Sequence, residues 1–359
     1  MSTLLVTGGA GFIGGHVVRA ALDRGWRVRV LDDLRPDVHA GDVEPVERVE
    51  GIDVVRGSVT DPIAVDRALE GVDAVSHQAA KVGLGVDLSD APDYAHTNVT
   101  GTAELLAAMT RRGVGRLVLA SSMVVYGEGS YRRGDRVVRP PARTVADLRA
   151  GRFEPLDEAG DPLEPVLIEE DVTLEPRTVY AATKLAQEHL VAAWVRETGG
   201  SALALRYHNV FGAGMPQGTP YAGVASFFRS SLAAGLAPRV FEDGGQLRDF
   251  VDVRDVASAN LAALACTRTT PGFRAFNIGS GTPRTILEFA RTLARVCGGP
   301  EPVVTGEYRL GDVRHLTASS ARAEREIPWR AAVPFVDAVR DFAEAPMRDR
   351  VRGAEPHLG

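Results

Sequence analysis

From the start of the chain to about residue 208, short apolar runs alternate with longer segments in which apolar residues recur at helical spacing. Strands that are apolar almost throughout are typical of a parallel sheet covered by helices on both faces. The runs predict strands at residues 4–7, 28–31, 53–55, 74–76, 117–120 and 203–207. The segments between them predict helices at 12–24, 63–69, 94–111 and 179–197. We therefore expect an α/β fold with a doubly wound parallel sheet.

After residue 209 the alternation loosens into loops with Gly and Pro, and helices are expected at 224–234, 256–266 and 286–296. This change predicts a first domain over residues 1–208, a smaller substrate lobe over 209–345 that is interleaved with it, and a tail over 346–359. Ligands of doubly wound sheets bind at the carboxyl ends of the strands, so the cleft between the lobes is the expected site. Residues 128–172 interrupt the pattern, and we expect either a lid over that cleft or a decorative insertion.

A glycine turn, TGGAGFIG over residues 7–14, joins the first predicted strand to the first helix. Gly8, Gly11 and Gly14 permit a tight turn and let backbone N–H groups approach a pyrophosphate, as in a Rossmann dinucleotide site. Asp32 ends the next strand, where a carboxylate takes the ribose 2′-hydroxyl. That carboxylate would repel a 2′-phosphate, so NAD is favoured over NADP, although the nearby Arg35 is compatible with NADP.

A candidate catalytic pair, Tyr180 and Lys184, lies one helical turn apart, so the two side chains share a face. A neighbouring ammonium and an oxidised nicotinamide favour the phenolate of a tyrosine, whose ordinary pKa is about 10. The phenolate can take a proton from an alcohol while hydride leaves for the cofactor. Lys81 and Lys184 are the only lysines among 41 Lys and Arg residues, which makes a chance pairing improbable. The hydroxyl that completes the site is Ser121 or Ser122, at the end of a predicted strand.

The composition narrows the partners. A formal net charge of −6 argues against a surface built to bind nucleic acid. Cys266 and Cys297 form no CxxC pair, which suits a reducing compartment and gives no reason to expect a metal site. No run approaches the roughly 20 apolar residues that span a bilayer, and the first apolar run lacks a signal-peptide layout. We expect a cytoplasmic protein that binds neither nucleic acid nor membrane.

Taken together, the motifs resemble the extended short-chain dehydrogenase/reductase family, the nucleotide-sugar epimerases and dehydratases, over residues 4–320. Besides Asn98 and the Tyr180–Lys184 pair, the matching stretches are 8–14 (GGAGFIG), 77–80 (HQAA), 121–127 (SSMVVYG), 205–209 (LRYHN), 248–253 (RDFVDV), 276–279 (FNIG) and 311–315 (GDVRH). In the family the hydroxyl lies five positions before the glycine of the Tyr-Gly pair. The resemblance therefore selects Ser122 as the catalytic partner of Tyr180 and Lys184.

The resemblance also implies the binding residues. On the side of NAD they are Gly8, Gly11, Phe12, Ile13, Gly14, Asp32, Asp33, Ser58, Val59, Gln78, Ala79, Ala80, Asn98, Tyr180, Lys184 and Tyr207. On the side of a nucleoside-diphosphate sugar they are Lys81, Met123, Asn209, Val224, Phe241, Arg248 and Arg309. Asn209, Arg248 and Arg309 look like binders of the diphosphate, which wants amide and guanidinium donors. Lys81, one of the two retained lysines, is expected to face the substrate, and Ser58 stands where the family more often has an aspartate near the adenine.

The implied reaction follows from two positions. Dehydratases of the family carry an Asp-Glu pair directly after the catalytic hydroxyl, and this chain has Met123 and Val124 there. Neither side chain is an acid or a base, so the resemblance implies epimerisation at C4, in which a 4-keto sugar turns over and takes the hydride back on its other face.

The stretches 220–228 and 241–249 look closest to the bacterial dTDP-L-rhamnose 4-epimerase group, which makes dTDP-6-deoxy-L-talose. The open alternatives are a UDP-glucose or UDP-glucuronate 4-epimerase, a nucleotide-ketosugar reductase or decarboxylase, and a non-catalytic NAD-sensing regulator. Helices 94–111 and 179–197 resemble those that pair across dimers in this family, so a homodimer is expected.

Overall fold

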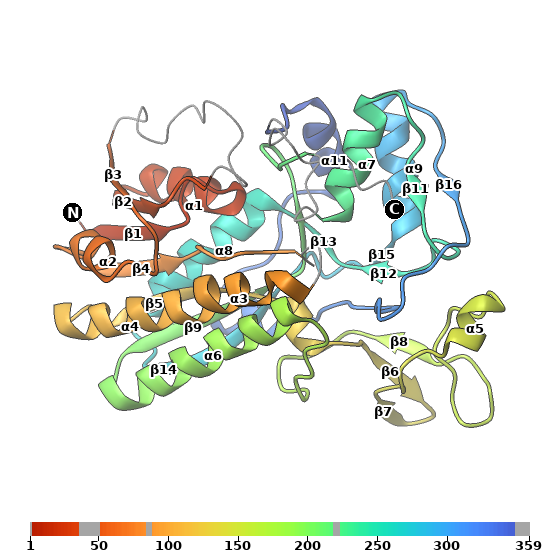
Figure 1. The fold of residues 1–359 in the computed structure, drawn as a ribbon, viewed down its shortest axis with the longest axis horizontal. Helices are drawn as coiled ribbons and strands as arrows, with labels where there is room; N and C mark the ends of the chain where they lie inside the picture. Colours follow the sequence, from red (N-terminus) through yellow and green to blue (C-terminus); the bar gives the residue numbers. More distant parts are fainter. Residues whose placement is uncertain (1, 36–50, 84–87, 218–222, 349–359) are drawn as a thin grey trace.

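The structure, a computed structural model, describes residues 2–35, 51–83, 88–217 and 223–348. At its centre lies a seven-stranded sheet in the order β14-β9-β5-β4-β1-β2-β3, and every pair of neighbours is parallel (Figure 1). The strands are β1 (Thr3–Thr7), β2 (Arg27–Asp32), β3 (Ile52–Arg56), β4 (Ala74–His77), β5 (Arg116–Ser122), β9 (Ser201–Tyr207) and β14 (Gly272–Ile278). The predicted doubly wound parallel sheet is confirmed.

Strand β14 corrects the predicted strand set, because the hydrophobic pattern placed no strand after residue 209. It pairs with β9 from Gly272 opposite Ser201 to Ile278 opposite Tyr207. Its first four residues are only partly buried or exposed at the edge of the sheet, and only its last three are buried. The strand therefore lacks the continuous apolar run by which the other strands were found.

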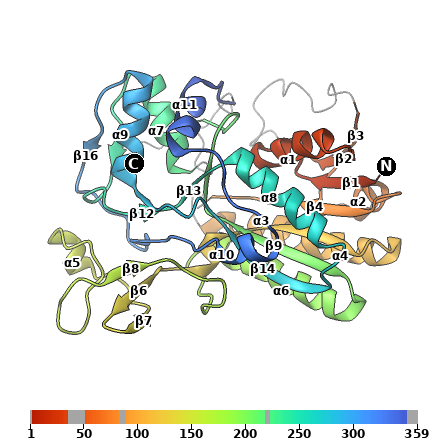
Figure 2. The ribbon, with the colours of Figure 1, turned by 180° about the vertical axis from the view of Figure 1, so that it is seen from behind.

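Helices cover both faces of the sheet (Figures 1 and 2). On one face α1 (Phe12–Asp23) packs against α8 (Val253–Cys266), and their inner side chains share a core with β1, β5 and β9. On the other face lie α2 (Pro62–Ala68), α4 (Gly101–Arg112) and α6 (Val179–Thr198) over a second core. Because α8 and β14 follow residue 209, the second half of the chain completes the central sheet and its helical cover.

The helix predicted at 94–111 is longer and irregular. It consists of α3 (Ala91–Tyr94), a π-helical stretch η3 (Ala95–Thr100) and α4, and a short 3₁₀ turn η2 (Leu88–Asp90) precedes it. Stretches of π-helix are rare and often accompany functional sites. Here the stretch carries Asn98, one of the predicted cofactor-side residues.

The second lobe stands beside the sheet in Figure 1 and has a core rich in phenylalanine. Phe250 stacks on Phe289 at 4.2 Å between ring centroids, and Phe211 meets Phe289 edge-on at 5.2 Å. Its elements are β10 (Asn209–Phe211), α7 (Val224–Ala233), β11 (Arg239–Val240), β12 (Leu247–Arg248), β13 (Phe250–Asp252), β15 (Arg284–Thr285), α9 (Ile286–Cys297), β16 (Val303–Val304) and α11 (Phe335–Glu344), while α10 (Ala321–Glu326) packs against β14. Of the predicted tail, residues 349–359 lie outside the described part of the chain, as do Pro220 and Tyr221 of the lobe.

The insertion at 128–172 has secondary structure of its own, unlike the loop that the sequence suggested. It contains a small antiparallel sheet of β6 (Ser130–Arg133), β7 (Arg136–Val138) and β8 (Glu164–Val166). The short helix α5 (Val145–Arg149) lies between β7 and β8 in the chain. Figure 1 shows this arm reaching out below the second lobe. We call residues 128–172 the arm.

Buried charges attach the arm to the second lobe. The Arg314 guanidinium, 1% exposed, donates to Glu154 of the arm at 2.9 Å and to Glu242 of the lobe at 2.8 Å. Arg143 of the arm pairs with the same Glu242 at 2.8 Å. Breaking such a pair leaves an uncompensated buried charge, which is strongly unfavourable. The network attaches the part of the arm around α5 to the second lobe, and movement of the arm as a lid stays a prediction.

Candidate active site

Several predicted site residues lie at the carboxyl ends of the central strands. Asp32, Ser122 and Tyr207 are the last residues of β2, β5 and β9, and Thr7 and His77 end β1 and β4. Since these strands are parallel, their carboxyl ends share one edge of the sheet, which is where doubly wound folds bind ligands.

The glycine turn lies close against the end of β4. Gly8 has a φ of +67°, and a Cβ there would be 2.7 Å from the Cα of Ala79. A Cβ on Gly14 would be 2.1 Å from the carbonyl oxygen of Gly8, so neither position accepts a side chain. Helix α1 starts after Gly11 with Phe12 and Ile13, and no side chain caps its N-terminus. An uncapped helix N-terminus behind a glycine turn fits a pyrophosphate.

The carboxylate predicted to bind the ribose is held in place by backbone amides. Asp32, 8% exposed, accepts the N–H groups of Ala10 and Leu34, each at 3.0 Å. Asp33 beside it is exposed. Arg35, the residue that was compatible with NADP, binds Asp93 of α3 through both terminal nitrogens at 3.0 Å. A bidentate pair of this kind orients the guanidinium toward α3, and the arrangement favours NAD.

Other cofactor-side predictions fall into small polar contacts. Gln78 and Tyr207 bind each other at 3.2 Å, and both bind Asn260 of α8, at 2.9 and 2.8 Å. Burial raises the pKa of Tyr207 to about 12, so the phenol acts as a neutral donor. Asn260 was not predicted, because nothing in its local sequence sets it apart from other helical residues.

The remaining cofactor-side residues follow β3 and β4. Ser58 binds the Thr60 hydroxyl at 2.9 Å, and Val59 is buried. The N–H of Ala79 donates to the Thr7 hydroxyl at 3.2 Å, and Ala80 follows it, partly buried. These contacts order the two loops that border the glycine turn.

Asn98 joins the loop after β4 to helix α6. Its Oδ1 accepts the N–H of Lys81 at 2.8 Å, and its Nδ2 donates to the Lys81 carbonyl at 3.0 Å and to the Thr183 hydroxyl at 2.9 Å. The Lys81 ammonium itself lies between Asp90 at 2.8 Å and Asp93 at 2.7 Å, with its side chain 9% exposed. The ammonium is thus paired with carboxylates of the protein itself. A contact between Lys81 and substrate stays a prediction.

The three predicted catalytic side chains converge. The Ser122 hydroxyl lies near enough to the Tyr180 phenol to lower its pKa, and the Lys184 Nζ lies 5.9 Å from the Tyr180 ring centroid. Lys184 donates to the carbonyl of Ala120 at 2.9 Å. The neighbouring hydroxyl of Ser121 donates instead to Glu188 at 2.5 Å. Because Glu188 engages Ser121, Ser122 stays the predicted partner of Tyr180.

Burial dominates the charges of this pair. It raises the pKa of Tyr180 to about 12, which the Ser122 hydrogen bond only partly offsets. It also lowers the pKa of Lys184 to about 7, against the opposing effect of Glu188. The side chains alone therefore keep the phenol neutral near pH 7. A positive nicotinamide beside the phenol would favour the phenolate.

Glu188 is a residue that sequence reasoning missed. It lies one turn beyond Lys184 on α6, is 3% exposed, and binds Arg206 of β9 through both carboxylate oxygens at 2.9 and 2.7 Å. The i,i+4 spacing from Lys184 was the available signal. The bidentate pair fixes α6 on the sheet and keeps Ser121 engaged.

The predicted substrate residues line the second lobe and the base of the arm. Met123 opens the 3₁₀ turn η4 (Met123–Tyr126) and packs against a small core that includes Ile168 of the arm. Val224 begins α7. The Arg309 guanidinium lies over the Phe241 ring, 4.8 Å from its centroid.

Two predicted diphosphate binders differ in how the protein holds them. The Arg248 guanidinium is turned to backbone carbonyls, of Leu247 and Val313 at 2.8 Å and of Arg314 at 2.9 Å, and burial lowers its pKa. Asn209 begins β10, and its buried Oδ1 has no hydrogen-bond partner among the described residues. A buried acceptor of this kind needs a donor from a ligand or a water, whereas a diphosphate oxygen would be met by the Asn209 Nδ2.

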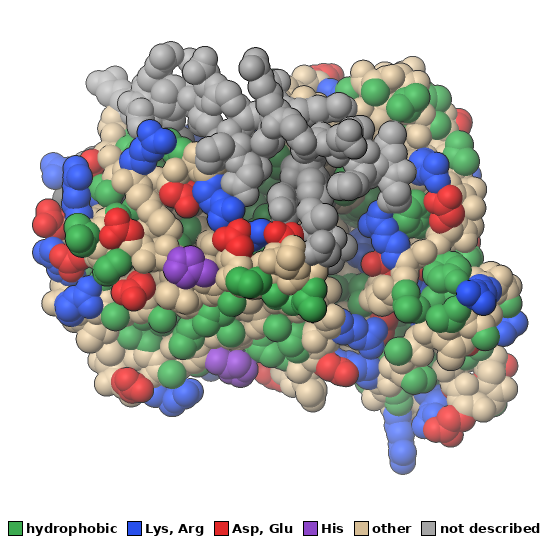
Figure 3. All heavy atoms as spheres, viewed as in Figure 1, with side chains coloured by type: hydrophobic (Ala, Val, Ile, Leu, Met, Phe, Trp, Pro, Cys, Tyr) green, Lys and Arg blue, Asp and Glu red, His purple; other side chains and the backbone are tan. Residues whose placement is uncertain are grey.

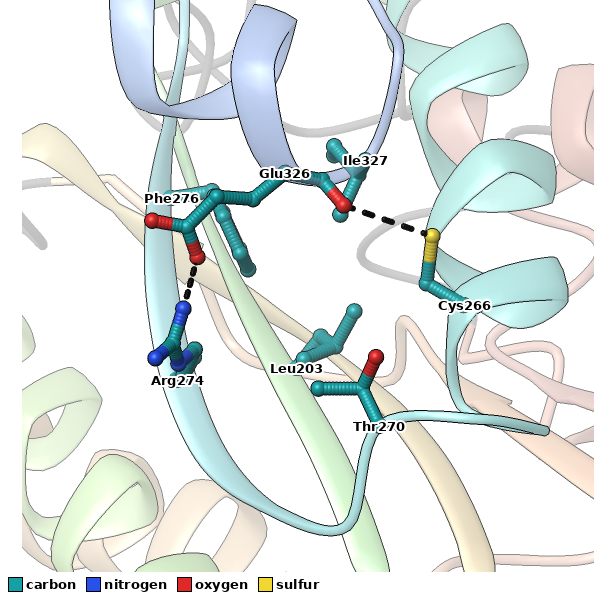
Figure 4. Close-up of a pocket in the computed structure, with 7 residues that line it drawn as sticks. All are labelled: Leu203, Cys266, Thr270, Arg274, Phe276, Glu326 and Ile327. Atoms are coloured by element: carbon teal, nitrogen blue, oxygen red, sulfur yellow. Dashed lines mark hydrogen bonds and ion pairs between the residues drawn. The ribbon is translucent and has the colours of Figure 1, made fainter.

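The remaining surface adds little chemistry. A pocket of about 230 Å³ is lined by Leu203 of β9 and by Arg274 and Phe276 of β14, and Glu326 contacts both Arg274 and Cys266 there (Figure 4). Figure 3 shows acidic and basic side chains interspersed on one face. In the described ranges, His, Cys, Asp and Glu side chains form no group of three or more that is arranged to hold a metal ion. None of the helices in these ranges has the length and apolarity to cross a bilayer.

Comparison with known proteins identifies the class. The profile of the NAD dependent epimerase/dehydratase family matches residues 4–146 and 156–279. The dTDP-L-rhamnose 4-epimerase of Burkholderia thailandensis is 37% identical over 337 residues, which cover 91% of this chain and 90% of that protein. The UDP-glucose 4-epimerase of Bacillus subtilis is 30% identical over 346 residues, with coverage of 91% and 92%. The protein belongs to the NAD dependent epimerase/dehydratase family.

A solved structure agrees with this membership. The crystal structure of Thermus thermophilus UDP-glucose 4-epimerase in complex with NAD has a TM-score of 0.73 at 29% identity, and covers 98% of this chain and 100% of that one. The predictions of an extended short-chain dehydrogenase/reductase, of an isomerase-type enzyme and of NAD as cofactor are confirmed.

The first testable consequence separates the two serines. Ser122→Ala removes the hydroxyl that binds the phenol, so turnover should fall about 10- to 100-fold, the worth of a hydrogen bond to a charged group. Ser121→Ala is the matched control, because it removes only the bond to Glu188. It should lower the melting temperature and change the turnover little. Steady-state rates and thermal unfolding of both variants test this. Equal losses of turnover, or a larger loss for Ser121→Ala, would contradict the assignment.

The second consequence concerns pH. A lysine in an unfolded chain titrates near pH 10.4, whereas the pKa of Lys184 in the folded protein is about 7. Below the folded value both states carry the charge, and the folded state bears the cost of burying it. Between the two values the unfolded chain binds the extra proton, so the folded state gains stability as pH rises.

Lys184→Met removes this cost. The variant, freed of cofactor, should therefore exceed the wild type in free energy of unfolding at pH 7, and the difference should shrink toward pH 10. Urea unfolding at both pH values measures it. A difference that stays constant across this range would show that Lys184 is not held with a lowered pKa.

Proposed function

We propose that the protein is a nucleotide-sugar 4-epimerase that converts dTDP-L-rhamnose to dTDP-6-deoxy-L-talose. The observation that carries the proposal is the convergence of Ser122, Tyr180 and Lys184 with Met123 and Val124 directly after the hydroxyl. The site thus has an acid and base for one alcohol, and no second pair at the positions where dehydratases of the family have one. The choice of sugar is supported by 37% identity to a dTDP-L-rhamnose 4-epimerase, against 30% to a UDP-glucose 4-epimerase.

Tyr180 acts twice in the reaction, first as a base and then as an acid. As a phenolate, Tyr180 takes the proton of the C4 hydroxyl, and Ser122 donates a hydrogen bond to the same sugar oxygen. Lys184 stabilises the phenolate by its charge. NAD, when bound, accepts the C4 hydride and returns it. After the 4-keto sugar has turned over, Tyr180 gives the proton back to the ketone oxygen, so C4 is inverted with no net oxidation.

Recognition of the diphosphate falls to the second lobe. Asn209 would supply an amide at the end of the sheet, and Arg309, stacked on Phe241, a guanidinium. Arg248 would add a second positive charge near the diphosphate, with its guanidinium held by hydrogen bonds to backbone carbonyls. Val224, Met123 and Lys81 would complete the walls of the sugar site.

The assembly and location are part of the same proposal. The protein would work as a cytoplasmic homodimer that pairs through the outer faces of α4 and α6, two helices that lie side by side on one face of the sheet. Neither nucleic acid nor a membrane has a part in it.

A substrate panel tests the function. The wild-type protein is incubated in catalytic amount, without added cofactor, with dTDP-L-rhamnose, UDP-glucose or UDP-glucuronate. We expect inversion at C4 of dTDP-L-rhamnose, read by NMR, and no net formation or consumption of NADH. Tyr180→Phe is the control and should lower the rate about 10²- to 10⁴-fold, the usual contribution of acid–base catalysis.

The other outcomes each point elsewhere. Conversion of a UDP-sugar in place of dTDP-L-rhamnose would replace the substrate assignment. Stoichiometric turnover of added NADH would indicate a ketosugar reductase, and release of carbon dioxide from UDP-glucuronate a decarboxylase. Binding of NAD without turnover of any sugar would favour a sensing regulator.

A further inference from the structure

The chain returns to the cofactor turn after its last helix. Beyond α11 the backbone runs along residues 214–217, the segment that precedes α7. The N–H of Arg348 donates to the carbonyl of Met215 at 3.2 Å, the N–H of Gln217 donates to the carbonyl of Arg348 at 3.4 Å, and Pro216 and Arg348 form a parallel bridge. The second lobe thereby sets the position of residue 348.

The Arg348 side chain reaches from there to the glycine turn. Its Nη1 donates to the carbonyl of Ala10 at 2.6 Å, and its Nη2 donates to the carbonyl of Gly11 at 3.0 Å. Gly15, in the first turn of α1, lies on the same side, since a Cβ there would be 3.7 Å from Nη2. A single guanidinium therefore braces the two residues that lead into α1.

The electrostatics of this position favour an anion nearby. The N-terminus of a helix carries a partial positive charge, so a cation placed there is unfavourable by itself. Burial, and then the charge of Arg19, lower the pKa of Arg348, while Asp32 acts in the opposite direction. The Asp32 carboxylate already accepts the amides of Ala10 and Leu34.

The Arg348 guanidinium also has more N–H donors than its bonds to the turn use. A guanidinium has five N–H donors, and the bonds to Ala10 and Gly11 use two of them. A pyrophosphate at the uncapped start of α1 would satisfy the helix end and the guanidinium together.

We propose that Arg348 is a further cofactor-binding residue, which braces the glycine turn through the carbonyls of Ala10 and Gly11 and offers its charge and its other N–H groups to the NAD pyrophosphate. Residues 346–348, which lie beyond the part matched by the family profile, then link the second lobe to retention of the cofactor. The inference depends on NAD as cofactor and not on the identity of the sugar.

The test compares ligands with and without a pyrophosphate. Full-length wild type, Arg348→Ala and the control Arg19→Ala are freed of NAD, and their dissociation constants for ADP-ribose and for adenosine are measured by calorimetry. Arg19 is an exposed neighbour on α1, so its removal changes the charge equally without touching the turn. For Arg348→Ala we expect ADP-ribose to bind about 10- to 100-fold more weakly, adenosine to bind as in the wild type, and less NAD to be retained on purification. Arg19→Ala should resemble the wild type.

A conservative variant guards against a folding defect. Arg348→Lys keeps the charge but cannot bridge both carbonyls, so its affinity for ADP-ribose should lie between those of the wild type and Arg348→Ala. Wild-type affinity of Arg348→Ala for ADP-ribose would overturn the proposal. So would an equal loss of adenosine binding, or an equal loss of ADP-ribose binding in Arg19→Ala.

Discussion

Lys184 holds its ammonium against the carbonyl of Ala120 at 2.9 Å, 3% exposed, on the side of α6 that faces the sheet. The rest of the site is arranged around this contact, because it places α6 relative to the end of β5. With α6 in that place, Tyr180 lies near enough to Ser122 for the hydroxyl to lower the pKa of the phenol. The bidentate pair of Glu188 and Arg206, one turn further on, prevents the helix from sliding along the sheet. Burial favours the neutral form of both side chains, and a cationic nicotinamide beside the phenol would favour its phenolate.

The second half of the chain serves this site from two directions. Strand β14 and helix α8 complete the sheet and its cover, and Asn260 of α8 orders Gln78 and Tyr207 at the edge where the cofactor binds. The phenylalanine core holds the second lobe over the same edge. The network around Arg314 attaches the arm to that lobe, and the family profile skips residues 147–155 near its tip. The arm and the second lobe thus meet at buried charges.

The sequence was most informative where the physics is local. Continuous apolar runs predicted six of the strands, and the glycine turn and the Tyr180–Lys184 spacing predicted the chemistry, because tight turns and helical faces depend on a few adjacent residues. Strand β14 escaped detection, since an edge strand with three buried residues has no apolar run. Asn260, Glu188 and Arg348 escaped for another reason: each acts through a partner on a distant segment. The position of the Lys81 ammonium between Asp90 and Asp93 likewise depends on folding and not on its scarcity.

The central claim is that hydride leaves C4 and returns to C4 within one active site. It is tested most directly with dTDP-L-rhamnose that carries deuterium at C4, incubated with the enzyme in deuterium-free water containing unlabelled NADH. The expected result is epimerised product that retains deuterium at C4, with none transferred to the solvent or to the added NADH. Product that has lost the deuterium would contradict direct return of the hydride, and with it the role given to Tyr180, Ser122 and Lys184.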